Sequence, residues 1–551
     1  MSEKYSKEFS NDRRAVLAGM ASVAGAAGMG AVARVGRVFA SEGADPIVKT
    51  RYGKVRGYRE GGLCIFKGIP YGATTAGAGR FMPPRPPEPW SDIRDAKVWG
   101  PASPQPIRVT VVLPNDADQQ KVQGEDCLVL NVWTPSANGS GKRPVMMWLH
   151  GGGFAAGSAG SSVFDGSYLA SHGDTVLVSI NHRLNGMGYL YLGDLLGSKY
   201  AASGNAGNLD IVLALKWISE NIHEFGGDPG NVTVFGESGG GAKVSCLMAM
   251  PSAAGLFHNA VIQSGAALRA FEKQNAAEFA RQVVAELKIE QNPKAILDLP
   301  PKAIFEATAV VTARNADPRG AFSGRARLGA GPVVDGVVLL RNPCDPDAPA
   351  QSANIPLMIG HNGSEATLFL LSDPLFGKMT ESDLEKRLDT MYGPDMAKKA
   401  LEIHRAANPK GSPSDLLADI MSGRMVANTT IFADRKSAQG RAPVYYYVLE
   451  WETPERGGLL RSPHALDLSL VFNTISQTKN TTGTGPDPQR LADQMSATWL
   501  AFARHGDPNN SMIPTWPKYN SVKRDEMAFN LQSHVVSDPK SEVRQFWMTA
   551  S

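Results

Sequence analysis

A sharp turn between a strand and a helix is the sequence feature that most constrains this chain. Residues 235–240 read Phe-Gly-Glu-Ser-Gly-Gly, after the apolar run 232–234 and before a helix-like stretch at 242–250. A Gly-x-Ser-x-Gly in this place forces a tight, strained turn, because only glycines at its flanks let the two backbones pass closely. The turn leaves Ser238 at the carboxyl edge of a sheet. Ser238 is therefore a candidate nucleophile.

Short apolar runs alternate with helical patterns around this turn. Buried strands are expected at 145–149, 175–180, 232–235, 260–263, 356–360 and 444–449. One amphipathic helix is expected at 208–222, ending near the Phe-Gly-Gly-Asp-Pro at 225–229. Alternation of this kind predicts an α/β fold, with a large, mostly parallel central sheet and helices on both of its faces.

Two longer helical segments, near 270–310 and 380–440, have no place in the predicted sheet. We expect them to be helical lid insertions over its carboxyl edge, within a single domain that spans residues 41–551. The stretch 476–488 is rich in Thr, Gly and Asn, and its composition is typical of a mobile loop. The sequence contains no internal repeat.

The first forty residues have the features of an export signal. The pair Arg13-Arg14 precedes an uncharged stretch rich in Ala and Gly at 15–33, and small residues near position 40 suit cleavage there. A membrane anchor is the alternative, but the stretch is only weakly apolar. We therefore expect residues 1–40 to be a twin-arginine-type signal peptide. The mature protein would then be exported, to a bacterial periplasm or out of the cell, without a stable membrane span.

Charge and cysteine usage exclude two classes of partner. The formal net charge of +3 lies entirely within residues 1–40, and the rest of the chain is electrically balanced. Nucleic-acid binding needs a concentrated basic face, so no nucleic acid is expected as a partner. The four cysteines form no CxxC pair and no Cys/His cluster, so no metal site is expected. Nothing in the pattern predicts an oligomeric state.

The residues after the later strands include a candidate acid and a candidate base. A serine hydroxyl needs a base to take its proton, and a carboxylate to orient that base. In a fold of this kind the acid and the histidine follow the serine in the chain, each after a later strand. Glu365 lies in the loop after the expected strand 356–360, five residues beyond its end, and His464 follows the strand 444–449 by a loop. Taken alone, the local sequence favours a solvated loop residue at each position, so the assignment depends on the whole set.

Three other histidines beyond Glu365 fit the role of base less well. They lie in a polar helical pattern, in a Gly-Asp-Pro turn and in the polar tail; they are His404, His505 and His534. His464 is therefore the preferred base.

A glycine-rich loop supplies candidate donors for an oxyanion. Residues 150–154 read His-Gly-Gly-Gly-Phe and follow the expected strand 145–149. Successive glycines allow backbone N–H groups to point inward, so Gly152 and Gly153 are the candidate donors, together with Gly239 after the nucleophile. A plain glycine-rich turn is the alternative. A nucleotide cradle is rejected, because the chain has no Gly-Lys-Ser/Thr and the loop does not match the dinucleotide fingerprint.

Together these motifs resemble those of the type-B carboxylesterases, a family of the α/β-hydrolase superfamily that includes bacterial para-nitrobenzyl-esterase-like enzymes. The resemblance runs from about residue 50 to residue 516. Besides the turn itself, it is carried by Phe-Lys-Gly-Ile-Pro-Tyr at 66–71, Glu-Asp-Cys-Leu at 125–128, Asn-His-Arg-Leu at 181–184, Phe-Gly-Gly-Asp-Pro at 225–229 and Phe-Ala-Arg-His-Gly-Asp-Pro-Asn at 502–509.

The resemblance implies the α/β-hydrolase fold and a catalytic site without a cofactor. It assigns the triad to Ser238, Glu365 and His464, and the oxyanion hole to Gly152, Gly153 and Gly239. It also implies that Glu237 is a buried structural partner.

Some residues depart from the family pattern. The pair Gly239-Gly240 stands where alanine is usual, which predicts a roomier or more flexible oxyanion corner. Ala366 stands where a glycine often follows the acid. Ser103 stands where a cysteine is often found, so Cys127 is expected to lack its usual disulfide partner.

The leading hypothesis is a serine carboxylesterase that acts on a small-molecule ester through an acyl-enzyme intermediate. The absence of tryptophan from residues 106–124 argues against choline esters. One alternative is a non-catalytic adhesion or binding protein that kept the fold, since fold alone does not give function. Another is a hydrolase of a specialised lactone, amide or aromatic ester.

Overall fold

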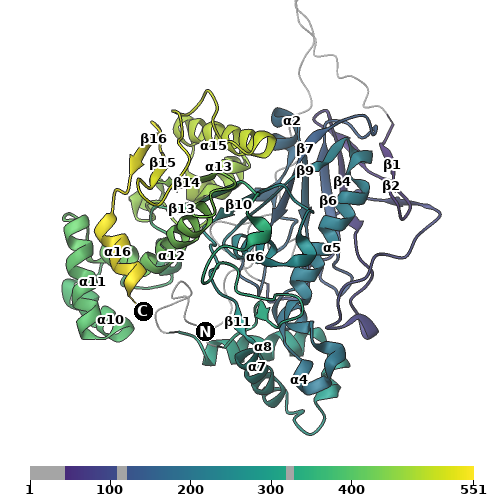
Figure 1. Cartoon of the computed structure of the whole chain (residues 1–551), viewed down its shortest axis with the longest axis horizontal. Helices are drawn as coiled ribbons and strands as arrows, with labels where there is room; N and C mark the ends of the chain where they lie inside the picture. The colour runs from purple at the N-terminus through teal and green to yellow at the C-terminus, as the bar shows by residue number, and fades with distance from the viewer. Residues whose placement is uncertain (1–43, 108–120, 318–327, 551) are drawn as a thin grey trace, which may run out of the picture. The chain divides into compact units, whose positions relative to one another are not determined.

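The computed structural model describes residues 44–107, 121–317 and 328–550 (Figure 1). The expected signal peptide at 1–40 lies outside the described residues. Residues from Ala44 onward form one compact unit.

A large mixed sheet organises this unit. Across the described part of the chain it has eleven strands, in the order β16-β15-β14-β13-β10-β9-β7-β8-β6-β4-β3. The seven strands from β15 to β8 are parallel, and the strands at the two sides are antiparallel. Along the chain the strands are β3 (Tyr58–Glu60), β4 (Leu63–Pro70), β6 (Val129–Thr134), β7 (Arg143–Leu149), β8 (Val176–Ile180), β9 (Gly227–Glu237), β10 (Asn259–Gln263), β13 (Leu357–Asn362), β14 (Val444–Leu449), β15 (Asp525–Phe529) and β16 (His534–Ser537).

Two smaller sheets complete the described strands. One pairs β1 (Ile47–Lys49), β2 (Lys54–Arg56) and β5 (Ile93–Asp95), and the other pairs β11 (Phe271–Glu272) with β12 (Val333–Val334).

Both faces of the large sheet are buried. Alternate residues of β7 enter different cores: Met147 and Leu149 lie in one, and Met146 and Trp148 lie in the other. Helices α5 (Ala206–Asn221), α6 (Gly239–Ala249) and the end of α12 (Pro413–Ser437) cover the first face. Helices α2 (Ser167–Gly173), α13 (Leu466–Val471) and α15 (Pro486–His505) cover the second. Burial on both faces explains why the central strands have continuous apolar sequences.

The remaining helices lie in the connections, except for α16, which follows the last strand. They are α3 (Asn185–Tyr189), α4 (Gly193–Leu196), α7 (Lys273–Glu286), α8 (Pro301–Arg314), α9 (Thr367–Leu370), α10 (Glu381–Tyr392), α11 (Pro394–Ala407), α14 (Lys479–Thr482) and α16 (Ser541–Thr549). Helices α7 and α8 lie side by side near α4 in Figure 1, and α10 and α11 pair with each other.

The two expected lid segments correspond to α7–α8 and to α10–α12. Their role as a lid stays a prediction. The end of α12 has a different place: Phe432 and Ala433 pack in the core on the sheet beside β14, so this part of the segment covers a face.

The prediction of a mobile loop at 476–488 is wrong for most of its length. This stretch contains α14 and the first turn of α15, and Thr481 and Thr482 are buried. The N–H groups of both threonines donate to the carbonyl of Thr478, which closes a helical turn that composition alone does not reveal.

Most predicted central elements are present within a few residues. The strand expected at 444–449 has these bounds in the structure, whereas the strand expected at 232–235 is longer and begins at Gly227. The two glycines of the Gly-Gly-Asp-Pro after the predicted helix therefore have different structural roles. Gly226, with φ 76°, ends the helical turn, and Gly227 begins β9.

Candidate active site

Ser238 occupies the strained turn that its motif predicts. It lies between the last residue of β9 and the first residue of α6, with φ 55° and ψ −120°. The flanking glycines are needed for steric reasons, because a Cβ at Gly236 would lie 2.5 Å from the carbonyl carbon of Gly240. A Cβ at Gly240 would lie 2.0 Å from the oxygen of Leu149, the last residue of β7. The backbone conformation of Ser238 is unfavourable in itself, and the packed surroundings keep the residue in it.

Glu365 and His464 meet in the protein core. Glu365 lies three residues after β13 and is fully buried, while His464 lies just before α13 and is 4% exposed. Glu365 Oε2 is 2.5 Å from Nδ1 of His464. The other oxygen, Oε1, accepts bonds from Ser264 Oγ and from the N–H of Asn362, both at 2.7 Å. The carboxylate of Glu365 therefore holds the imidazole at its Nδ1 edge. The carboxylate is itself held by the hydroxyl of Ser264 and the N–H of Asn362.

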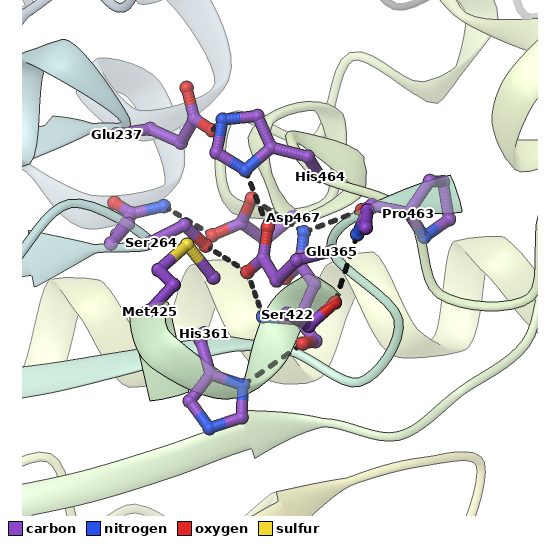
Figure 2. A network of polar contacts seen from close by, with 12 residues as sticks. Glu237, Ser264, His361, Glu365, Ser422, Met425, Pro463, His464 and Asp467 are labelled. Carbon is purple, nitrogen blue, oxygen red and sulfur yellow. Dashed lines mark hydrogen bonds and ion pairs between the residues drawn. The ribbon is translucent and has the colours of Figure 1, made fainter. Parts of the chain in front are cut away.

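Glu237, the residue before the serine, lies at the opposite side of the imidazole. Figure 2 shows the ring of His464 between the carboxylates of Glu237 and Glu365. Glu237 Oε1 is 3.1 Å from Nε2 of His464. Nε2 therefore faces the side chain of the residue that directly precedes Ser238, so the candidate base lies beside the turn that carries the candidate nucleophile.

The two carboxylates control the charge of the imidazole. Burial lowers the pKa of His464, but the charges of Glu237 and Glu365 outweigh this effect and raise it above the usual range. Burial raises the pKa of Glu237, while the neighbouring imidazolium lowers it. A neutral imidazole, which a general base requires, is favoured when Glu237 holds the proton.

A second layer of buried polar groups supports this pair. Asp467 Oδ2 accepts bonds from Gln263 Nε2 at 2.8 Å and from the hydroxyl of Tyr447 at 3.2 Å. Gln263 in turn accepts a bond from Trp499 Nε1 at 3.0 Å. These bonds link β10, β14, α13 and α15 beneath the site.

The glycine loop lies directly beside the turn. Gly152 and Gly153 have φ values of 84° and 64° and are exposed. A Cβ at Gly151 would lie 3.4 Å from Cβ of Ser238. Gly239 is even closer to the loop, because a Cβ there would lie 2.1 Å from the carbonyl oxygen of Gly153. The structure therefore brings all three candidate oxyanion donors together.

The same distances correct the prediction of a roomier oxyanion corner. The space that a side chain at Gly239 would use is filled by the backbone of Gly153. The missing methyl group allows closer approach of the loop, so the corner is tighter than the sequence indicated.

Sequence reasoning missed several residues that the structure places here. Ser264 follows β10, and only the alignment of β10 beside β13 in the sheet brings it to Glu365. The ring of Phe369 on α9 lies 5.3 Å from the imidazole of His464 and is 44% exposed, so it stands at the open side of the site. Lys243 on α6 is buried against the glycine loop. Ser264 lies in a Gln-Ser-Gly motif at 263–265 that also fits the family resemblance, but the sequence assigned no role to any of the three residues.

The other candidate histidines lie elsewhere. His404 is buried in α11, where it accepts a bond from Trp547 Nε1 at 2.9 Å. His505 is the last residue of α15, and His534 is exposed at the start of β16.

The cysteines are buried and unpaired. All four, Cys127 included, are free thiols. Ser103 hydrogen-bonds to the Cys127 thiol and stands where a disulfide partner would be needed.

The described residues contain neither a cluster of metal-binding side chains nor a helix that could span a membrane. Within residues 44–107, 121–317 and 328–550, no three His, Cys, Asp or Glu side chains are grouped so that they could hold a metal ion. No helix in the described part of the chain combines the length and apolar character needed to cross a membrane.

Comparisons with known proteins identify the family of the chain. The sequence profile of the Carboxylesterase family matches residues 44–547. The chain is 33% identical over 504 residues to the para-nitrobenzyl esterase of Bacillus subtilis (strain 168), which covers 91% of this chain and 98% of the relative.

Solved structures show the same fold. The Geobacillus stearothermophilus carboxylesterase EST55 superposes with a TM-score of 0.77 at 37% identity, covering 91% of this chain and 99% of the other. An esterase from Clostridium hathewayi, described as hydrolysing aliphatic aromatic polyesters, superposes with a TM-score of 0.76 at 32% identity, covering 92% and 98%. The chain therefore belongs to the carboxylesterase family, has the α/β-hydrolase fold and is a carboxylic ester hydrolase.

Proposed function

We propose that this protein is a serine carboxylesterase that works through an acyl-enzyme on Ser238, with His464 as general base and acid and Glu365 as the orienting carboxylate. The observation that carries the proposal is the 2.5 Å contact between Glu365 Oε2 and His464 Nδ1 in the core. This contact fixes the ring so that Nε2 is directed toward the serine turn. A base oriented in this way is what a serine nucleophile requires.

In the first half of the reaction, Ser238 Oγ forms a bond to the ester carbonyl carbon. Its proton passes to Nε2 of His464, and Glu365 stabilises the imidazolium that forms. The carbonyl oxygen becomes an oxyanion. When the tetrahedral intermediate collapses, the carbon–oxygen bond to the alcohol breaks, and the alcohol takes the proton from Nε2.

In the second half, water replaces the alcohol. Water gives a proton to Nε2 and attacks the acyl carbon, and collapse returns that proton to Ser238 Oγ and releases the acid. The N–H groups of Gly152, Gly153 and Gly239 stabilise the oxyanion in both halves. Each such donor is typically worth about 3–4 kcal/mol in the transition state.

The test compares Ser238→Ala with Ser245→Ala, a buried serine on the same helix α6 whose hydroxyl bonds to the Gly241 carbonyl. Turnover of p-nitrophenyl acetate should fall by at least about 1,000-fold in Ser238→Ala and stay near wild type in Ser245→Ala. An organophosphonate should label the wild type at Ser238, as located by peptide mass spectrometry. Near-full turnover by folded Ser238→Ala would refute the mechanism, and a wild type that neither turns over esters nor is labelled would favour a binding protein.

The family indicates the class of substrate, and a panel of substrates can define which members of that class the enzyme prefers. We propose small-molecule carboxylic esters, since the relatives include a para-nitrobenzyl esterase and an esterase described as acting on aliphatic aromatic polyesters. A panel of esters graded by acyl length and alcohol bulk, extended to lactones and amides, would define the preference. An amide turned over faster than every ester would overturn the class, whereas a preferred lactone would narrow it to cyclic esters.

We also propose that residues 1–40 direct export by a twin-arginine route. The Arg13-Arg14 pair and the weakly apolar stretch behind it support this. Replacing both arginines by lysine should leave the enzyme in the cytoplasm of the producing cell. An unchanged exported fraction, or a mature exported protein that still begins at Met1, would refute it.

A further inference from the structure

Lys243 is a buried lysine that the proposed reaction does not use. It lies on α6, one helical turn after Gly239, and is completely inaccessible to solvent. Its Nζ donates to the carbonyl oxygen of His150 at 3.1 Å and to that of Gly153 at 2.9 Å. One side chain therefore bridges His150 and Gly153, the residues on either side of Gly151 and Gly152.

Every carbonyl oxygen of this loop accepts a hydrogen bond. The oxygen of Gly151 accepts from His150 Nδ1 at 2.9 Å. The oxygen of Gly152 accepts from the N–H groups of Ala155 and Ala156 at 3.3 and 3.2 Å. Lys243 serves the remaining two. Within the described residues, by contrast, no hydrogen bond engages the N–H of Gly152 or Gly153.

This pattern sets the direction of the N–H groups. The peptide unit is planar and trans, so a carbonyl held on one side places the N–H of the next residue on the opposite side. Three successive glycines otherwise allow each of these peptides to rotate at little steric cost. The N–H groups of Gly152 and Gly153 belong to the two central peptides of the loop, whose carbonyls are held by His150 and by Ala155 and Ala156. Lys243 holds the peptides on either side of these two, through the carbonyls of His150 and Gly153, and so ties both ends of the loop to α6.

The surroundings of Lys243 are suited to holding the loop. The ring centroid of Phe154 lies 5.3 Å from Nζ, and the carboxylate of Glu237 acts on the lysine electrostatically. Burial lowers the pKa of Lys243 to about 7. Both the ammonium and the neutral amine carry enough hydrogens to donate two bonds, so the bridge does not depend on the charge.

We propose that Lys243 is a positioning residue for ester hydrolysis: it clamps the glycine loop against α6 so that the N–H groups of Gly152 and Gly153 face the oxyanion. The proposal rests on the proposed function, because it assigns these N–H groups to transition-state stabilisation. It predicts that loss of the clamp reduces transition-state binding while ground-state binding of the ester is retained.

A second buried lysine provides a matched control. Lys436 on α12 is also inaccessible to solvent, and its Nζ donates to the carbonyl oxygens of Ser352 and Ala353 at 2.8 and 2.9 Å. These carbonyls belong to a connection before β13 that lies apart from the glycine loop. Lys436 also donates to Gln439 Oε1 at 3.1 Å. Lys243→Met and Lys436→Met thus each remove a buried amine that bridges two backbone carbonyls, one in the glycine loop and one in the connection before β13.

The experiment measures kcat and KM for p-nitrophenyl acetate in both variants, with active sites counted by phosphonate titration and folding followed by thermal unfolding. For Lys243→Met we expect kcat and kcat/KM to fall together by about 10- to 100-fold, with KM within about twofold of wild type. For Lys436→Met we expect a lower melting temperature and an unchanged kcat per titrated site. If Lys243→Met is not recovered folded, Lys243→Gln is measured in the same way, and the same loss of kcat at unchanged KM is expected.

Three results would overturn the proposal. The first is a kcat of Lys243→Met (or of Lys243→Gln) equal to that of the wild type. The second is a change in that variant that is confined to KM. The third is a loss of kcat in Lys436→Met as large as the loss in Lys243→Met. Ser238→Ala separates this failure from failure of the proposed function. An inactive Ser238→Ala beside a fully active Lys243→Met rejects only the clamp, whereas an active Ser238→Ala rejects the mechanism on which the clamp rests.

Discussion

Adding one methyl group at Gly239 tests how tightly the oxyanion corner is packed. The Cβ of Gly239→Ala would lie 2.1 Å from the oxygen of Gly153, whereas real Cβ atoms essentially never approach closer than 3.0 Å. The loop must therefore retreat by about 0.9 Å, and Gly153 cannot retreat freely because Lys243 holds its carbonyl. A misplacement of about 1 Å at a catalytic group can cost about 100-fold in rate, which corresponds to about 2.7 kcal/mol.

The assay is kcat for p-nitrophenyl acetate per phosphonate-titrated site, with thermal unfolding recorded in parallel. The matched control is Gly241→Ala on the same helix, where a Cβ would lie 3.1 Å from the oxygen of Gln263 and would not meet the loop. We expect about 100-fold loss of kcat in Gly239→Ala and less than about threefold loss in Gly241→Ala. A Gly239→Ala enzyme with wild-type kcat and melting temperature would refute the packing argument.

Three further predictions concern buried titratable groups. Glu237→Gln removes a negative charge that raises the pKa of His464. The acid limb of the kcat/KM–pH profile should therefore move to lower pH by about one unit. A move to higher pH would contradict this prediction. Burial lowers the pKa of His404 to about 4. Because the unfolded chain binds that proton near pH 6.5, about 3 kcal/mol of the free energy of unfolding should be present above pH 6.5 and lost as the pH falls toward 4. Denaturant unfolding across this range should give a flatter profile for His404→Gln. Asp210→Asn breaks the buried bidentate pair with Arg183, whose contacts are 2.7 and 2.9 Å, and should cost about 3–5 kcal/mol of unfolding free energy; an unchanged melting temperature would count against this value.

The central strands could be predicted from sequence because they are buried on both faces and therefore have continuous apolar runs. Strand β14 is an example, with all six residues buried. The antiparallel strands at the sides were not predicted. Strand β4 contains Lys67 and Gly68, and its pairing with β6 is irregular between Phe66 and Ile69, so it has no clear period.

The residues of the candidate site also fall into two groups: those that local sequence predicts and those that only the fold brings together. Ser238 and the glycine loop were predictable because their backbone geometry demands particular residue types. Ser264 was not, because only the pairing of β10 with β13 brings it to Glu365. Lys243 has the sequence context of an ordinary helical lysine, and only the position of the glycine loop shows that its amine is buried.

The order of strands at the site has a consequence for folding kinetics. The serine turn, Ser264, Glu365 and His464 follow β9, β10, β13 and β14, which are consecutive neighbours in the sheet. The Glu365–His464 bond closes a span of 99 residues, and the Ser264–Glu365 bond closes one of 101. Contacts of such long sequence separation form slowly, because the entropy of loop closure is lost before the contact stabilises the chain. Recovery of esterase activity after dilution from denaturant should therefore lag behind recovery of helical circular dichroism, which makes catalysis a reporter of the last parallel pairings to form.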